Sequence, residues 1–222
     1  MTVLPWAAAF AATRSAEVIV PVHPGFQGTH RPEPLRTPRG LAELYLRMLE
    51  ALGLETVTVV GNSIGGWIAA EIAALGSSRV SAVVLVDAVG LVVAGHPYVD
   101  FPSLTPAEVA ARSYHDPARF GVDPSKLPPE AQAAMAGNRA TLAVYGGDMT
   151  DPTLASRLPG IDVPVLVVWG AADRIGDPAI GEAFAELIPG ARLEVISDAG
   201  HLPQIETPSR LDELVGSFAD LH

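Results

Sequence analysis

Five short apolar segments, rich in β-branched residues and each followed by turn residues, stand out along the chain. Three of the five are almost uninterrupted apolar runs, a pattern typical of strands that other elements cover on both faces. Strands covered in this way usually belong to a parallel sheet. The pattern therefore predicts strands at residues 17–22, 56–61, 80–88, 163–170 and 191–198.

Amphipathic segments alternate with these predicted strands. Between the first two strands, apolar residues recur at helical spacing from Leu41 to Leu52, and Gly53 is suited to end that helix. Asp177 and Thr207 each precede a proline, the usual pairing of a helix-capping residue with proline in the first turn. The alternation predicts an α/β fold, a mostly parallel sheet with helices on both faces.

The middle of the chain breaks this alternation. Residues 92–160 contain helical patterns and no convincing strand, and Thr105 with Glu108 forms a plausible capping box. We expect a helical cap inserted into a core made of residues 1–91 and 161–222, at the place where a lid over a site would lie. Its larger apolar side chains could line a pocket or hold the cap helices together, and we favour the second role for most of them: Tyr98, Phe101, Tyr114, Phe120 and Met135.

Composition narrows the function. With 222 residues and 49% hydrophobic content, the chain can bury the core of one domain. A net charge of -11 argues against nucleic acid or an anionic membrane as a partner. The chain has no cysteine, which fits a reducing cytoplasm, and its apolar start lacks a preceding basic segment. We expect a soluble, cytoplasmic protein.

Candidate chemistry begins with Ser63, in the stretch GNSIGG between a predicted strand and a predicted helix. A serine hydroxyl becomes a nucleophile when it projects into a cleft where an imidazole can take its proton. A tight strand-to-helix turn achieves this, and we expect Gly61 and Gly65 to relieve its crowding. The same turn directs the Ile64 N–H at a developing oxyanion. A glycine-rich turn with an incidental serine is the alternative.

A serine nucleophile needs a histidine and an acid. Asp173 and His201 each follow a predicted strand, at the sheet edge where open α/β sheets build their sites. The order Ser63, Asp173, His201 is the one that this type of turn carries. His23 lies closer to a strand end but precedes the serine in the chain. The other candidates are weaker because they lie before a strand, in a helix cap, in a turn, in loops, in the insertion or at the terminus: Asp162, Asp177, Asp198, His30, His96, His115 and His222.

From about Trp6 to Phe218 the chain resembles the α/β-hydrolase-fold family, through GNSIGG, WGAADRIGDP, DAGHLPQIETP and PVHPGFQGT. The resemblance implies a serine nucleophile at Ser63, an orienting acid at Asp173, a general base at His201 and a substrate-covering cap. Serine at this position disfavours the dehalogenases and epoxide hydrolases of the fold, which use aspartate there. Asn62 is similar to the residue found in carbon-carbon bond hydrolases of ring-fission products.

One departure from the family concerns the start of the chain. The family has further strands and a His-Gly loop ahead of the first helix, and that loop supplies a second oxyanion N–H. Here LPWAAAFAA matches the helix, and no segment matches the strand that would lie between 17–22 and 56–61. We expect a truncated sheet that could close up or be filled by another chain, so self-association is possible, and a weakened oxyanion hole.

Three functions stay open at this stage. The first is a serine hydrolase acting on a small hydrophobic ester, lactone or related carbonyl substrate, with carbon-carbon bond hydrolysis as a variant. The second is a small-molecule-binding homologue with little or no turnover. The third, a purely structural module, is disfavoured because three separately placed catalytic-type residues would then be coincidental. No metal and no organic cofactor is implied.

Overall fold

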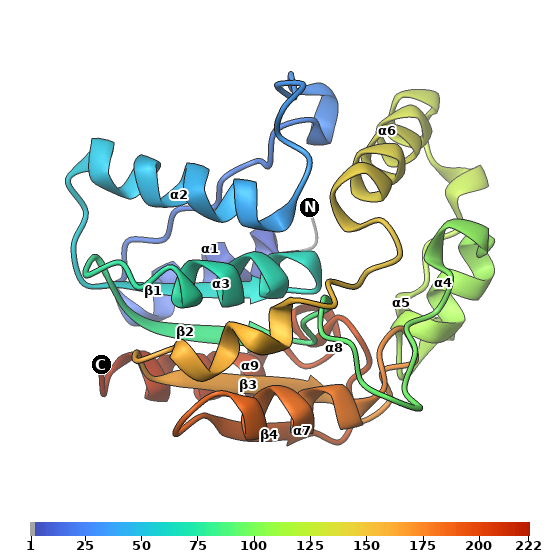
Figure 1. Ribbon diagram of the computed structural model, residues 1–222. Helices are drawn as coiled ribbons and strands as arrows, with labels where there is room; N and C mark the ends of the chain where they lie inside the picture. Colours follow the sequence, from blue (N-terminus) through green and yellow to red (C-terminus); the bar gives the residue numbers. More distant parts are fainter. Residues whose placement is uncertain (1–2) are drawn as a thin grey trace.

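The computed structural model describes residues 3–222 and shows a single parallel sheet with helices on both faces (Figure 1). The strands run in the order β1 (Val57–Asn62), β2 (Val80–Val86), β3 (Val165–Gly170) and β4 (Arg192–Ile196). Register pairs Val59 with Val83 and Leu85 with Val167. The expected fold class, a mostly parallel sheet between helices, is therefore confirmed.

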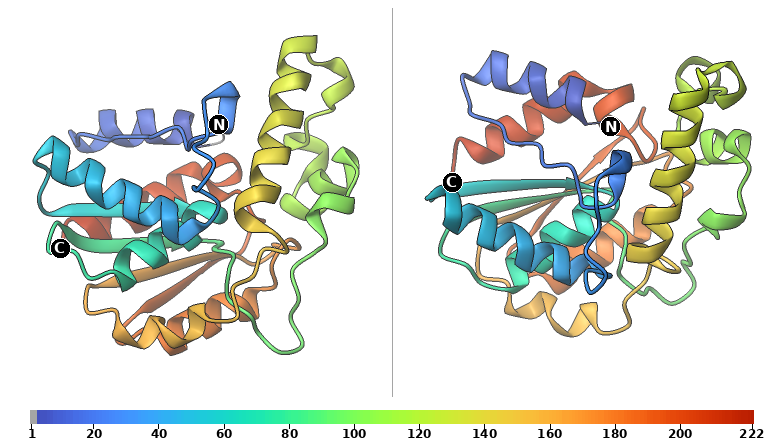
Figure 2. Two further views of the ribbon diagram at one scale, coloured as in Figure 1. Left: turned by 45° about the horizontal axis from the view of Figure 1, so that its top comes forward. Right: turned by 90° about the horizontal axis from the view of Figure 1, so that it is seen from above.

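Helices form two layers (Figure 2). One face of the sheet packs against α2 (Pro38–Leu52), α3 (Ile64–Ala74) and α7 (Pro178–Leu187), and the other against α1 (Leu4–Arg14) and α9 (Pro208–Ala219). Alternate residues of β2 explain both layers, because Val83 points to the first and Val84 to the second. Both are fully buried, which stabilises the fold by about 1.5–3 kcal/mol for each side chain.

Four of the five predicted strands are present, and the fifth is wrong. Residues 16–23 form irregular chain with no strand pairing. A strand requires a neighbour for its backbone N–H and C=O groups. Within residues 3–222, β1 is hydrogen-bonded only to β2 and forms the edge of the sheet, so segment 17–22 has no adjacent strand.

The helix ends follow the predicted signals, with one exception. Gly53 ends α2 in the left-handed conformation at φ 67°, and the Asp177 carboxylate accepts from Ala179 N–H at the start of α7. Thr207 precedes α9 but makes no capping bond with its side chain. The Thr207 hydroxyl instead donates to the Pro203 carbonyl at 3.4 Å. Pro203 begins the short helix α8 (Pro203–Glu206), which ends directly before Thr207.

The α-helices of segment 92–160 lie beyond the carboxyl ends of the strands (Figure 1). The last part of segment 92–160 runs back beside the sheet, where Leu154 and Leu158 are buried in the core. Thr105 and Glu108 make the predicted capping box at the start of the first α-helix of this segment, and the extended pairing described for the segment is an isolated bridge between Gly90 and Thr150. Its elements are η2 (Phe101–Ser103), α4 (Pro106–Ser113), α5 (Pro117–Phe120), η3 (Pro124–Lys126), α6 (Pro129–Gly146), η4 (Leu154–Ser156) and η5 (Leu158–Gly160). A further 3₁₀ turn, η1 (Phe26–Gly28), belongs to the first half of the chain.

Within residues 3–222, no helix is both long enough and apolar enough to cross a membrane.

Candidate active site

Ser63 occupies a strained turn between β1 and α3. Its backbone has φ 57° and ψ -120°, a conformation that costs a non-glycine residue about 1–3 kcal/mol. The surrounding structure imposes this conformation, because Ser63 N–H donates to the Val86 carbonyl at 2.9 Å and Trp67 N–H donates to the Ser63 carbonyl at 3.2 Å. Backbone strain of this kind clusters at active sites and ligand-binding loops, which supports the hypothesis of a functional role for Ser63.

Only one of the two glycines predicted to relieve crowding around Ser63 does so. A Cβ at position 61 would lie 2.0 Å from the Gly65 carbonyl oxygen, so Gly61 is required, as expected. A Cβ at position 65 would meet nothing within 4 Å, so the prediction that Gly65 relieves crowding is wrong. Gly66 relieves crowding instead, because a Cβ there would lie 2.6 Å from the side chain of Ala88, which follows β2.

The start of α3 leaves donors near Ser63. Ser63 is the N-cap residue of α3 and makes no capping bond with its side chain. The first N–H groups of a helix have no partner within the helix, and the helix dipole adds positive potential at that end. The Ile64 N–H, at the first position of α3, is therefore suited to bind an oxyanion that forms beside Ser63.

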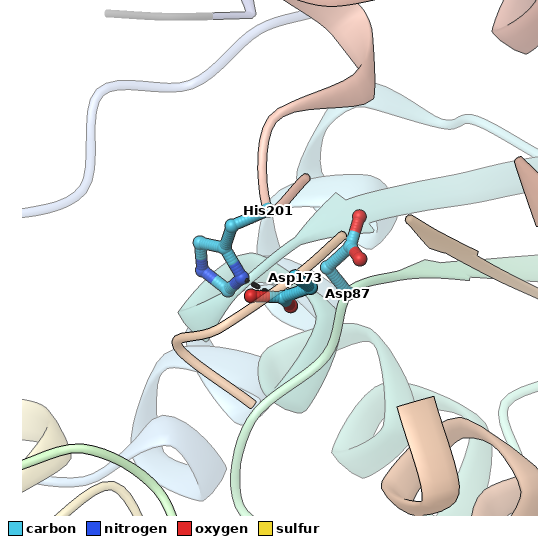
Figure 3. Close-up of side chains that lie close together, drawn as sticks. All are labelled: Asp87, Asp173 and His201. Carbon is cyan, nitrogen blue, oxygen red and sulfur yellow. Dashed lines mark hydrogen bonds and ion pairs between the residues drawn. The ribbon is translucent and has the colours of Figure 1, made fainter. Parts of the chain in front are cut away.

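His201 and Asp173 form a buried pair (Figure 3). His201 Nδ1 lies 2.8 Å from Asp173 Oδ2, and the two residues are only 6% and 4% exposed. The other carboxylate oxygen, Asp173 Oδ1, accepts from Ile175 N–H at 2.7 Å and from Gly176 N–H at 3.3 Å. The acid is thus oriented from both sides, and it orients the imidazole in turn.

Asn62 connects this pair to the serine turn. Its side-chain NH₂ donates to the His201 carbonyl at 3.0 Å and to the Val86 carbonyl at 3.2 Å. Its side-chain oxygen accepts from Gln204 at 3.1 Å. The residue next to Ser63 is therefore bonded directly to the backbone of His201, which places the predicted nucleophile and the predicted base at the same sheet edge.

Asp87 is a second acidic residue in this cluster, and the sequence analysis did not identify it. It directly follows β2, is fully buried, has φ 45° and accepts from Gly170 N–H at 2.8 Å. Burial, followed by the negative charge of Asp173, raises the pKa of the Asp87 carboxyl well above its ordinary range. The surroundings of Asp87 therefore favour its protonated form. Its signal in the sequence was an acidic residue immediately after an apolar strand.

Asp87, Asp173 and His201 also place one ligand atom each within 4.8 Å of one another, which is the spacing of a possible metal site. Hydrogen bonds already use most of these atoms. Both Asp173 oxygens, His201 Nδ1 and one Asp87 oxygen have partners within the protein. The arrangement therefore fits an oriented histidine better than a metal centre.

The weaker candidates lie apart from this cluster. Asp162 and Asp198 are exposed, and Asp177 caps α7 and lies 3.4 Å from the half-buried His96. His23 Nδ1 lies 2.5 Å from the Tyr45 hydroxyl, and burial lowers the His23 pKa. The other histidines are exposed: His30, His115 and His222.

Two aromatic residues of segment 92–160 pack on each other. The rings of Tyr114 and Phe120 stack with centroids 6.2 Å apart, and the Arg139 guanidinium lies 5.1 Å from the centroid of Phe101. Tyr98 packs closely over Gly176, beside the acid loop, and Met135 is largely exposed. These contacts fit side chains that hold helices together, as predicted for most of them.

The fold and this serine turn define a class of protein. Residues 4–208 match the model of the alpha/beta hydrolase fold family, and the chain belongs to that family. The resemblance inferred from the sequence motifs is thereby confirmed.

Individual relatives cover a range of chemistries. The chain is 28% identical to 2-hydroxymuconate semialdehyde hydrolase from Pseudomonas putida, over 96% of this chain and 80% of that protein. It is 29% identical to epoxide hydrolase EphH from Mycobacterium tuberculosis, over 81% and 94%. It is 33% identical to polyketide synthase ThaQ from Burkholderia thailandensis, over 95% of this chain but 11% of that protein. The chain therefore spans a small part of ThaQ and about half, 49%, of a further relative from an acetoin-cleaving system.

Solved structures show the same fold. The meta-cleavage product hydrolase CumD superposes with a TM-score of 0.75 at 23% identity, covering 100% of this chain and 84% of that one. An esterase from Thermogutta terrifontis superposes with a TM-score of 0.75 at 24% identity, covering 97% and 84%.

Proposed function

We propose that this protein is a serine hydrolase that acts on a small ester, lactone or related carbonyl substrate. The observation that carries the proposal is the joining of three features at one sheet edge: the strained turn at Ser63, the buried His201–Asp173 pair, and the Asn62 side chain that bonds the first to the second. The hydrolases among the relatives support the same class of reaction.

In this proposal His201 takes the Ser63 proton as Ser63 Oγ attacks the substrate carbonyl carbon. Asp173 holds the imidazole and stabilises its charged form. The Ile64 N–H binds the developing oxyanion, and the leaving group departs with the proton from His201. Water then attacks the acyl-serine by the same route in reverse. Segment 92–160 acts as a cap over the substrate, and the protein works in the cytoplasm.

Labelling with an active-site-directed fluorophosphonate tests the nucleophile. We expect one label per chain, at Ser63, and no label in Ser63→Ala, because only an activated serine reacts at a useful rate. Labelling that persists in the Ser63→Ala variant would contradict the assignment.

A pair of variants tests the acid. Asp173→Asn should lower turnover of a p-nitrophenyl ester by about 10⁴-fold, because an amide stabilises the wrong imidazole tautomer. Asp177→Asn is the matched control, since Asp177 caps a helix and also follows β3. Equal losses in the two variants would show that the acid is a different residue.

Hydrolysis of a carbon-carbon bond is the second candidate. Asn62 beside the nucleophile and the 28% identity to 2-hydroxymuconate semialdehyde hydrolase favour it. Loss of the visible absorbance of a dienol ring-fission product, dependent on Ser63, would place this reaction ahead of ester hydrolysis.

Epoxide opening is disfavoured because Ser63 stands where a carboxylate would be needed. If folded protein binds hydrophobic carbonyl compounds but shows no turnover above Ser63→Ala, the binding-protein alternative takes first place.

A further inference from the structure

Glu206, the last residue of α8, binds backbone N–H groups from two separate parts of the chain. Its Oε2 accepts from Gly200 N–H at 2.7 Å and from His115 N–H at 3.1 Å, and its Oε1 accepts from Asp116 N–H at 3.1 Å. Hydrogen bonds to a carboxylate are roughly twice as strong as those between neutral groups. One side chain thus joins the residue before His201 to the chain that follows α4.

The last turn of α4 makes further contacts with the same loops. His201 N–H donates to the Ser113 carbonyl at 2.8 Å, and Arg174 N–H donates to the Arg112 carbonyl at 3.1 Å. The approach is close, because a Cβ at Gly200 would lie 2.4 Å from the Ser113 oxygen. The end of α4 is therefore fastened to the loop of the acid and to the loop of the histidine.

These contacts matter because the bond to Asp173 orients the His201 ring through Nδ1. The Asp173 bond fixes the direction of the ring, but the position of its other nitrogen relative to Ser63 depends on the backbone of residues 199–202. A general base that moves by about 1 Å can lose roughly 100-fold in rate. Whatever fixes this backbone therefore acts on catalysis without touching the substrate.

We propose that Glu206 is a positioning residue, whose carboxylate holds the histidine loop against the end of α4 and keeps His201 at its working distance from Ser63. This inference rests on the proposed role of His201 as general base. It makes the first helix of segment 92–160 part of the support of the base, in addition to any role over the substrate.

Glu206→Gln tests the proposal. The amide keeps the shape of the side chain but turns an NH₂ group toward at least one of the three N–H donors and removes the charge. We expect kcat for a p-nitrophenyl ester to fall about 10–100-fold with KM changed less than about twofold. The low-field proton resonance of the His201–Asp173 hydrogen bond should shift or broaden. Glu213→Gln is the control, since Glu213 is 66% exposed and pairs with Arg210 on the surface.

A second variant, Glu206→Asp, keeps the charge but is one methylene too short to reach all three donors, and thermal unfolding of every variant is followed in parallel. We expect both Glu206 variants to remain folded and to lose kcat. Unchanged kcat and an unchanged resonance in either folded variant would overturn the positioning role of Glu206. In that case the hydrolase proposal would still stand, provided that the wild type shows turnover that depends on Ser63. A loss of kcat that only follows the loss of folded protein would also overturn it. A wild type without Ser63-dependent turnover would overturn both proposals.

Discussion

Gly61 and Gly65 flank Ser63 symmetrically in the sequence but not in space, and this asymmetry predicts opposite results for two similar substitutions. Gly61→Ala forces a Cβ against the Gly65 carbonyl, and the required backbone shift should destabilise the fold by about 1–3 kcal/mol or more. Gly65→Ala meets open space within α3 and should be neutral or slightly stabilising, because alanine is the better helix former. Urea denaturation of both variants measures this difference, and equal destabilisation would contradict the close approach at Gly61.

Asp87 gives a prediction for the pH dependence of stability. Because the pKa of Asp87 is raised in the native protein, Asp87 keeps its proton to a higher pH there than in the unfolded chain, where an ordinary aspartate pKa is about 3.9. The native state therefore binds more protons, so this residue makes the free energy of unfolding fall as pH rises above that value, by up to about 1.4 kcal/mol per unit.

Asp87→Asn retains an oxygen for the Gly170 N–H and cannot ionise. The variant should be more stable than the wild type at pH 7, and the difference should shrink toward pH 5. Urea unfolding between pH 5 and 8 tests this, with the exposed Asp162→Asn as a control whose curve should stay parallel to the wild type. A difference that is constant with pH would show that Asp87 is ionised in the native protein.

The sequence predicted some residues of the site better than others. Ser63, Asp173 and His201 each follow an apolar strand within a recognisable motif, so local pattern and chain order were sufficient to propose them. Asn62 and Glu206 could not be found in this way, because the partners that give them a role are distant in sequence. The Asn62 amide donates to a carbonyl 139 residues further along the chain, and the Glu206 carboxylate accepts from an N–H 91 residues earlier.

At the scale of elements, segment 17–22 and β1 show why a strand pattern is not sufficient. Both are short, β-branched and apolar, and both were predicted as strands. β1 is one because β2 supplies hydrogen-bond partners along its length, from Val57 to Asn62. Local sequence determines the strand propensity of a segment, whereas strand pairing depends on which other segments lie beside it. The central strands β2 and β3 were predictable because burial on both faces leaves an unbroken apolar run.

A buried charge joins three elements. Glu71 of α3 is fully buried and bonds to Arg39 of α2 at 3.0 Å and to Arg157, which follows η4 and also bonds to Asp151 at 2.6 Å. Such a carboxylate is tolerated in the interior only while its partners remain.

The two arginines should therefore differ in importance. Arg157→Leu removes the more buried partner and should destabilise the protein by about 2–4 kcal/mol, while Arg39→Leu, at a side chain 42% exposed, should cost about 1 kcal/mol or less. Chemical denaturation measures both, and a Glu71→Gln background should reduce the Arg157 effect. If both arginine variants lose the same stability, Glu71 does not depend on Arg157 in the way described.

At the scale of the whole molecule, the helices α4 and α6 of segment 92–160 bond to two separate parts of the rest of the protein. In α6, the Tyr145 hydroxyl donates to the Pro24 carbonyl at 3.0 Å, and the Thr141 hydroxyl donates to the Gly25 carbonyl at 2.8 Å. The side-chain oxygen of Asn138 accepts from the Gln27 N–H at 2.7 Å. Helix α4 bonds to the loops of Asp173 and His201, as described above. If segment 92–160 covers the substrate as proposed, these contacts should keep its two main helices in place, and substrates of different size would be accommodated by movements of side chains.

The contacts between the end of α4 and the loops of Asp173 and His201 also determine which segments a chimera with a relative must exchange together. A chimera that replaces residues 92–160 with the corresponding segment of another hydrolase would carry in foreign carbonyls at positions 112 and 113 and foreign N–H groups at 115 and 116. The native Arg174, His201 and Glu206 would then have to bond to groups shaped for other loops. The unit of exchange is therefore the helical segment together with residues 173–176 and 199–206, although almost 60 residues of the chain lie between the end of α4 and the first of those loops.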